Sequence, residues 1–137
     1  MYGGPITSGE AFARLKADLG SWYLLGFGVW AIQYENQIVG TCGFWQGKDW
    51  PRELTWWLLP EVRSNGIAYE ASIAAVICAY DCWKWETVET YMNDSNLPAQ
   101  KLAEKLGGTV TRRQVMPDGI ERSVYCLPKQ NLVGGSA

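Results

Sequence analysis

The sequence predicts an α+β domain in which helices cover one mixed, mostly antiparallel sheet. Two observations support this fold class: strand-like segments flank a long, nearly uncharged helical segment, and short turn signals separate all of the segments. The predicted order is helix, three strands, helix, strand, helix and two strands. A chain of 137 residues is expected to form one domain, which we place at residues 1–130, with residues 131–137 as a flexible tail.

The first helix is predicted over residues 8–24. Thr7 and Glu10 form a capping box, which satisfies backbone N–H groups at the helix start. Apolar residues then recur at helical spacing, at Phe12, Leu15, Leu19 and Trp22. We expect this apolar stripe to face the sheet.

Turn and capping residues set the boundaries of the remaining elements. Asn36 lies at a hairpin turn, Pro60 ends the third strand, and Gly107 ends the last helix. Gly40 and Gly43 lie within the second strand and indicate a bulge or a close approach of two backbones. The strands are predicted at residues 29–34, 37–45, 52–59, 87–92, 109–115 and 121–127, and the two further helices at residues 66–82 and 97–106.

The loop before the central helix predicts an anion site. Residues 63–68 (Arg-Ser-Asn-Gly-Ile-Ala) lead into a helix whose only charged residues are Glu70 and Asp81, so we expect this helix to be buried on most sides. The first four backbone N–H groups of a helix have no partner within it, and the macrodipole is positive there. Such a helix end binds phosphate or pyrophosphate.

Composition argues against several classes of function. The net charge of -2 provides no basic field, so we expect no nucleic-acid partner. The longest uncharged stretch, residues 19–34, is too short to cross a membrane, and the N-terminus shows no secretory signal, which predicts a cytoplasmic protein. The cysteines lack C-x-x-C spacing and the chain has no histidine, so we expect neither a metal site nor a histidine base.

Two motifs resemble the signatures of one family. The loop at residues 63–68 matches the Gln/Arg-x-x-Gly-x-Gly/Ala pattern of the GNAT superfamily of acetyl-CoA-dependent N-acetyltransferases. Asn96 and Glu104-Lys105-Leu106-Gly107 resemble the second signature, an Asn turn before a helix that ends in Glu-Lys-Leu-Gly. Gly3-Gly4-Pro5 and the segment from Thr41 to Trp45 resemble the branch that includes ribosomal-protein alanine N-acetyltransferases. The resemblance implies a three-layer α/β/α domain whose sheet is splayed at the cofactor site.

The resemblance also implies which residues hold acetyl-CoA, the expected cosubstrate. In this family the pantetheine arm lies in the gap of the splayed sheet, and backbone N–H groups of the loop bind the pyrophosphate. Asn96 resembles an Asn that contacts the pantetheine or acetyl region, and it fits a helix N-cap equally well; Arg63 fits a phosphate contact or a solvated side chain. The implied cofactor-binding residues are Trp57, Leu58, Leu59, Arg63, Asn65, Gly66, Ile67, Ala68 and Asn96.

The implied reaction is direct attack of a primary amine on the thioester in a ternary complex. A carboxylate, acting directly or through water, takes the amine proton, while a backbone N–H group stabilises the oxyanion. Glu53 resembles the acidic residue of the branch and is our candidate base; a surface salt bridge or an electrostatic anchor for the amine are its alternative roles. Two family acids, a Tyr and a Ser, are replaced by Ala103 and Ala99. Tyr125, Ser95, a water or solvent must then protonate the thiolate.

Two classes of function remain open from the sequence. The leading interpretation is an acetyltransferase that modifies a primary amine, either a peptide N-terminus or a small amine. The alternative is a catalytically weak or inactive CoA-binding or interaction module. The family has a strand and a helix before the position at which this sequence starts, and without them a sheet edge would be uncovered. Pairing of that edge in a homodimer, or strand exchange between two chains, is the remedy that we expect.

Overall fold

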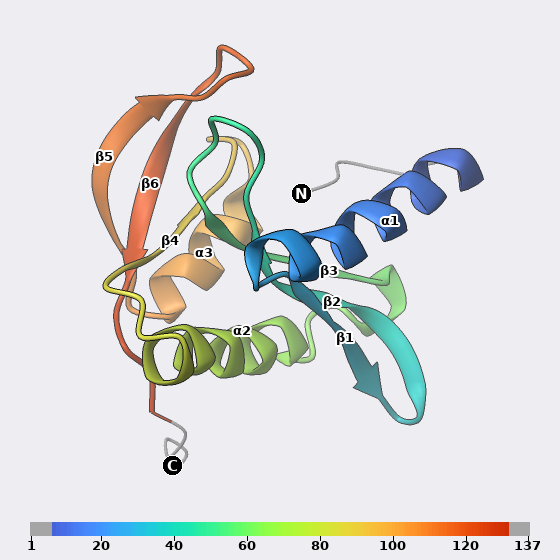
Figure 1. Ribbon diagram of the computed structural model, residues 1–137. Helices are drawn as coiled ribbons and strands as arrows, with labels where there is room; N and C mark the ends of the chain where they lie inside the picture. The colour runs from blue at the N-terminus through green and yellow to red at the C-terminus, as the bar shows by residue number, and fades with distance from the viewer. Residues whose placement is uncertain (1–6, 132–137) are drawn as a thin grey trace.

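The computed structural model describes residues 7–131, and its elements follow the predicted order (Figure 1). The Gly3-Gly4-Pro5 motif and residues 132–137 of the predicted tail lie outside the described residues. The predicted central helix is α-helical to Ile77 and continues as a π-helical turn, η2. The elements are α1 (Ser8–Leu25), β1 (Val29–Tyr34), β2 (Gln37–Trp45), β3 (Glu53–Leu58), the 3₁₀ turn η1 (Pro60–Val62), α2 (Ile67–Ile77), η2 (Cys78–Cys82), β4 (Val88–Tyr91), α3 (Leu97–Lys105), β5 (Thr109–Val115) and β6 (Glu121–Leu127).

The strands form two three-stranded antiparallel sheets, β1-β2-β3 and β4-β6-β5. Side chains join the two sheets at one end. The Thr90 hydroxyl of β4 donates to the Leu54 carbonyl of β3 at 2.9 Å, and the Tyr91 hydroxyl donates to the Pro51 carbonyl at 2.8 Å. Within the described residues no backbone ladder links β3 to β4. The predicted α+β fold with a splayed sheet is confirmed, and the splay divides the sheet in two.

Local signals explain the boundaries of α1 and of the first hairpin. The Thr7 hydroxyl accepts a hydrogen bond from the Glu10 backbone N–H at 3.1 Å, as a capping box requires. The β1–β2 turn has positive φ at Glu35 and Asn36, 50° and 65°, which matches a type I′ hairpin. A Cβ on Gly40 would lie 2.0 Å from the Trp57 carbonyl oxygen. The predicted close approach of backbones is therefore confirmed at this glycine.

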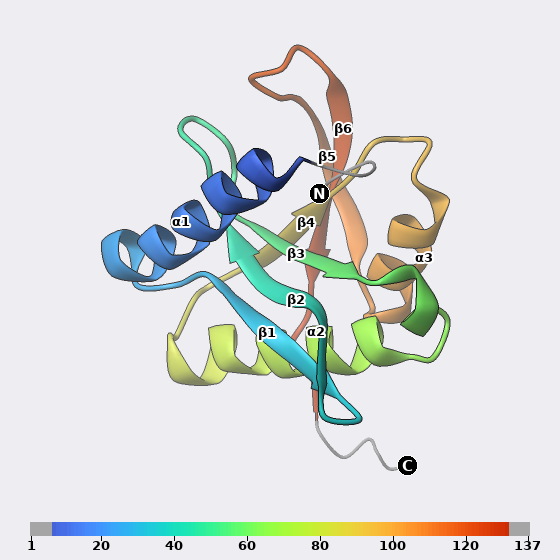
Figure 2. The same ribbon diagram turned by 90° about the vertical axis from the view of Figure 1, so that its right-hand side faces the viewer.

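The hydrophobic core lies between the strands and the helices α2 and α3. Leu54, Val76, Ala79, Ala103 and Leu127 are fully buried there. Helices α1 and α2 lie on different sides of the β1-β2-β3 sheet (Figure 2). None of the helices in residues 7–131 combines the length and the hydropathy needed to cross a membrane.

The prediction that the apolar stripe of α1 faces the sheet is wrong. No α1 residue is buried, and Phe12 and Leu19 are 62% and 63% exposed. The helix is held mainly near its C-terminal end, where the Trp22 indole N–H donates to the Val29 carbonyl at 2.9 Å and the ring packs edge-on against Trp30. Helical spacing shows which residues share a face, but it does not show whether another element covers that face.

Candidate cofactor pocket and catalytic site

A pocket of about 420 Å³ opens between the end of β3, the start of α2 and the helix α3. We call it the basic pocket. Of the nine predicted cofactor-binding residues, those that line it are Trp57, Leu58, Arg63, Gly66 and Ala68. Asn65 and Ile67 instead line a second pocket on the other side of α2.

The N-terminus of α2 is built to receive an anion. Its N-cap residue, Gly66, has φ 76° and ψ 5°, and no side chain caps the helix. A Cβ on Gly66 would meet no atom within 4 Å, so the left-handed φ and the open approach, rather than local crowding, favour glycine. The backbone N–H groups at this helix start lack intrahelical partners. The predicted anion site therefore has the expected backbone geometry.

Three cations surround this helix start. Arg63, Lys101 and Lys105 line the basic pocket, and none of the described residues that line it is acidic. The Lys105 ammonium lies 4.1 Å from the centre of the Tyr69 ring, which fixes the cation beside α2. Our sequence prediction missed both lysines. Their i, i+4 spacing in α3 places the two lysines on one helix face. This spacing was the signal in the sequence that could have identified them.

Successive residues of β3 direct their backbone N–H and C=O groups alternately toward β2 and toward the gap that faces β4. The Leu54 carbonyl accepts from Thr90, and the Leu58 carbonyl accepts from the Arg63 Nε at 3.0 Å, so both point away from β2. The Leu59 N–H donates to the Val39 carbonyl of β2 at 2.8 Å. Alternate residues of a strand share an edge. Trp56, which the sequence prediction missed, therefore directs its N–H and C=O into the gap, whereas Trp57 and Leu59 direct theirs toward β2.

Asn96 acts as the N-cap of α3. Its side-chain oxygen accepts a hydrogen bond from the Ala99 N–H at 3.3 Å. This is the helix-capping role that the sequence suggested beside a cofactor contact. The cap fixes the start of α3 and hence the position of the two lysines.

Glu53 is a buried carboxyl group at the start of β3. It is 8% exposed and pairs with Trp45 of β2. Burial raises its pKa to about 7, against the opposing influence of the Arg122 guanidinium and of a hydrogen bond from the Tyr91 backbone. Such a group accepts protons near neutral pH, which suits a general base. Its burial does not fit the surface salt bridge that was the alternative interpretation.

A buried arginine lies near Glu53 and was not anticipated from the sequence. The Arg122 guanidinium forms an ion pair with Asp118 at 2.7 Å and donates to the Asn93 side-chain oxygen at 2.8 Å. It also lies 5.6 Å from the centre of the Trp50 ring, which stacks on Tyr91. Glu53 therefore lies at an aromatic end of the gap that contains a fixed positive charge.

Tyr125, our candidate acid, lies on β6 opposite Thr90 of β4. It is 7% exposed, and burial raises its pKa. Ala99 and Ala103, the positions of the two family acids, are buried in the core. The phenol lies on β6, whereas Ala99 and Ala103 lie on α3. Within residues 7–131 no three His, Cys, Asp or Glu side chains gather as metal ligands.

Comparison with known proteins agrees with this geometry. Residues 1–109 match the family model of the acetyltransferase (GNAT) domain. No curated protein matches the sequence significantly. An acetyltransferase from Agrobacterium tumefaciens shares 26% identity at a TM-score of 0.81, over 92% of this chain and 75% of the other.

Two more distant structures share the fold. RimL, a ribosomal L7/L12 alpha-N-protein acetyltransferase, has 14% identity and a TM-score of 0.70, over 90% of this chain and 72% of its own. YncA from Salmonella typhimurium, a putative acetyltransferase solved with acetyl-CoA, has 19% identity and a TM-score of 0.66, over 92% of this chain and 76% of its own. These structures support the fold, and the family model covers most of the sequence. The chain belongs to the GNAT acetyltransferase family.

Proposed function

We propose that the protein transfers an acetyl group from acetyl-CoA to a primary amine. The observation that carries this proposal is the arrangement along β3: a buried carboxyl group at one end, an uncapped helix N-terminus with three cations at the other, and strand backbone directed into the gap between them. The cationic helix start suits the phosphates of acetyl-CoA, and the strand backbone suits its pantetheine arm. The carboxyl group supplies the base that an attacking amine needs.

The basic pocket fits the charged part of acetyl-CoA. The backbone N–H groups from Gly66 to Ala68 would hold the pyrophosphate, and Lys101 and Lys105 supply charge that favours phosphate. The Trp56 and Leu58 backbones face the gap, where the amides of a pantetheine arm would pair with them. We therefore place the backbone contacts of the pantetheine arm at Trp56 and Leu58 rather than at Trp57 and Leu59, while Trp57 still lines the basic pocket.

Glu53 would act as the general base. Three residues along a strand correspond to about 10 Å, so the carboxyl group lies within one pantetheine length of the backbone at Trp56. The amine attacks the thioester carbonyl, its proton passes to Glu53 directly or through water, and the oxyanion collapses with loss of the CoA thiolate. Tyr125 or water then protonates the thiolate. Each proton lost by nitrogen thus has an acceptor, and the thiolate has a donor.

We propose that the acceptor binds at the aromatic end of the gap. Trp50 and Tyr91 stack there beside the fixed Arg122, which favours a partly apolar acceptor near the amine over a polycation. A peptide N-terminus has these properties, and RimL is described as acting on a protein α-amino group. A cytoplasmic location is also part of the proposal. The four free cysteines support it, because secreted domains commonly oxidise their cysteines.

The test combines two measurements on the full chain. We expect CoA to bind in a calorimetric titration, and we expect free thiol to appear from acetyl-CoA only when an acceptor amine or peptide is added. Binding without thiol release on any member of a broad panel would favour the CoA-binding module instead. Absence of CoA binding would contradict both interpretations.

A further inference from the structure

The Thr55 hydroxyl of β3 is a buried polar group that the proposed reaction does not yet use. Thr55 is 5% exposed. Other buried hydroxyls have partners: that of Thr90 donates to the Leu54 carbonyl, and that of Ser72 lies 3.7 Å from the Cys42 Sγ. Within the described residues the Thr55 hydroxyl forms no hydrogen bond. A buried polar group without a protein partner is uncommon, and it points to a bound water or ligand.

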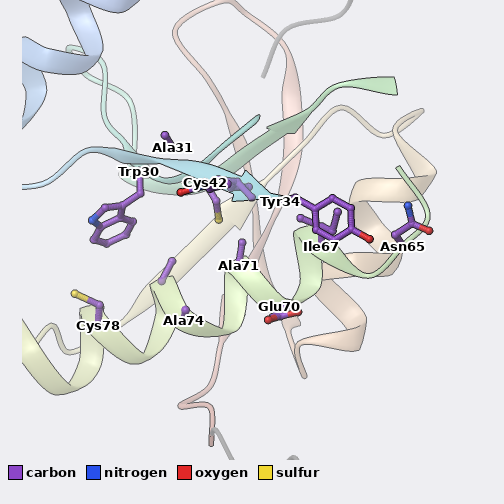
Figure 3. A pocket seen from close by; sticks show the side chains of 13 residues that line it. Trp30, Ala31, Tyr34, Cys42, Asn65, Ile67, Glu70, Ala71, Ala74 and Cys78 are labelled. Carbon is purple, nitrogen blue, oxygen red and sulfur yellow. The ribbon is translucent and has the colours of Figure 1, made fainter. Parts of the chain in front are cut away.

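The Thr55 side chain lies on the same face of the β1-β2-β3 sheet as that of Glu53. Cys42 of β2 is directly opposite Trp56, and its side chain is directed toward Ser72 and the helix α2 (Figure 3). Opposite residues share a face and successive residues alternate, so Trp56 faces α2. Glu53 and Thr55 therefore point to the other side of the sheet, where α1 lies (Figure 2).

The spacing of Glu53 and Thr55 suits a shared water. Two residues along a strand separate their Cα atoms by about 7 Å. Two hydrogen bonds through one water span about 5.6 Å. The Glu53 carboxyl group already accepts from the Tyr91 backbone N–H, but a carboxylate offers about four acceptor positions. One water can therefore contact both the carboxyl group and the hydroxyl.

Thr55 also lies between the candidate base and the backbone that faces the gap. Glu53 comes first along β3, Thr55 follows, and Trp56 then directs its N–H and C=O into the gap. In the proposed reaction the pantetheine arm pairs with that backbone, and its thioester approaches the Glu53 end. A water held by Thr55 would thus lie between the attacking amine and the carboxyl group.

We propose that Thr55 is a positioning residue whose hydroxyl holds the water that carries the acceptor proton to Glu53. This inference rests on the proposed acetyl transfer. The water takes a proton from the amine nitrogen and gives one of its own to the carboxylate, so it is unchanged overall. The C–N bond forms as the nitrogen attacks, and the C–S bond breaks with its electron pair on sulfur. The Thr55 hydroxyl donates to the water and keeps its own proton.

Thr55→Val and Thr55→Ser separate the hydroxyl from the methyl group. Valine keeps the shape that suits a strand but lacks the hydroxyl, so we expect turnover to fall about tenfold. CoA affinity should not change, and Tm should be no lower than that of the wild type, because no bond within the protein is lost. Serine keeps the hydroxyl and loses the methyl group, so we expect nearly normal turnover and a lower Tm. Thiol release, calorimetric titration and thermal unfolding give the three quantities.

Thr41→Val is the matched control. Thr41 is half-buried on the same sheet face, directly opposite Trp57, but it lies about 13 Å along β2 from Trp45, the partner of Glu53. We expect this variant to keep normal turnover.

Two results would overturn the assignment of Thr55 and leave the proposed acetyl transfer in place. One is normal turnover in Thr55→Val. The other is a loss in Thr55→Ser as large as that in Thr55→Val, because turnover would then not follow the hydroxyl. Absence of thiol release by the wild type with every acceptor would instead overturn both proposals.

Discussion

The two pockets beside α2 have the same volume, about 420 Å³, and opposite chemistry. The basic pocket has three cations and an uncapped helix start, whereas the pocket between β1 and α2 is lined by uncharged side chains and a single carboxylate, Glu70. Neighbouring residues serve both, since Gly66 lines one and Asn65 the other. Pocket size therefore does not identify the site that suits a phosphate-bearing ligand here. Charge and backbone hydrogen-bonding capacity make the distinction.

The largest expected effect is at Gly66. Gly66→Glu places bulk and negative charge where the phosphate is expected, and we expect CoA affinity to fall at least about a hundredfold, or about 2.8 kcal/mol. Gly26→Glu is the matched control, because Gly26 also has a left-handed φ, 79°, and a Cβ there would likewise meet no atom within 4 Å. Calorimetric titration compares the two variants. Equal affinities would remove the basic pocket from the cofactor site.

Glu53→Gln separates catalysis from binding. We expect turnover to fall about a hundredfold or more, the usual contribution of a general base, with CoA affinity within about twofold of the wild type. Glu61→Gln changes an exposed carboxylate of η1 and serves as the control. Steady-state kinetics of thiol release give the result. Unchanged turnover would leave Glu53 as a structural carboxyl group.

The pH dependence of kcat/KM also tests whether Glu53 is the general base. Burial raises the pKa of Glu53 to about 7, and only the ionised form accepts a proton. With an acceptor of constant protonation, kcat/KM should therefore rise about tenfold per pH unit below pH 7 and level off above it. A flat rate profile between about pH 5 and 8 would contradict the role of Glu53 as the base.

Lys101→Ala and Lys105→Ala test the charge of the basic pocket. Each lysine is exposed, so we expect a loss of about fivefold in CoA affinity, or about 1 kcal/mol, that diminishes at high salt. Lys129→Ala removes a charge elsewhere and should leave the affinity unchanged. Titrations at low and high ionic strength make the comparison. Losses that do not depend on salt would indicate a packing effect instead.

The smallest expected effect is that of Tyr125→Phe. A thiolate with a pKa near 8.5 is a good leaving group and needs little help from an acid, so we expect turnover to fall less than about tenfold. CoA affinity should not change. A normal rate in this variant would assign the final proton to water or solvent.

Local signals in the sequence predicted the elements well. The caps at Thr7 and Asn96 and the turn at Asn36 depend on neighbouring residues, and all three appear in the structure. Whether the backbone of a given β3 residue faces the gap depends on the register of β3 with β2. The gap-facing position of Trp56 could therefore not be identified from the sequence. Lys105 contributes to the pocket only because folding places α3 beside α2.

The exposure of the apolar stripe of α1 could not be predicted for a related reason. Helical spacing identified Phe12 and Leu19 as members of one apolar face. Whether that face packs against the same chain depends on where the helix lies, and α1 is tied to the strands mainly at Trp22. The burial of Glu53 likewise follows from its position between the sheets and not from its neighbours in sequence.

A crystal structure with bound CoA tests the central claim most directly. We expect the pyrophosphate on the backbone N–H groups from Gly66 to Ala68, and the pantetheine arm beside Trp56 and Leu58 with its sulfur directed toward the Glu53 end of the gap. CoA bound in the pocket between β1 and α2, or along β3 with its phosphates away from Lys101 and Lys105, would contradict the account.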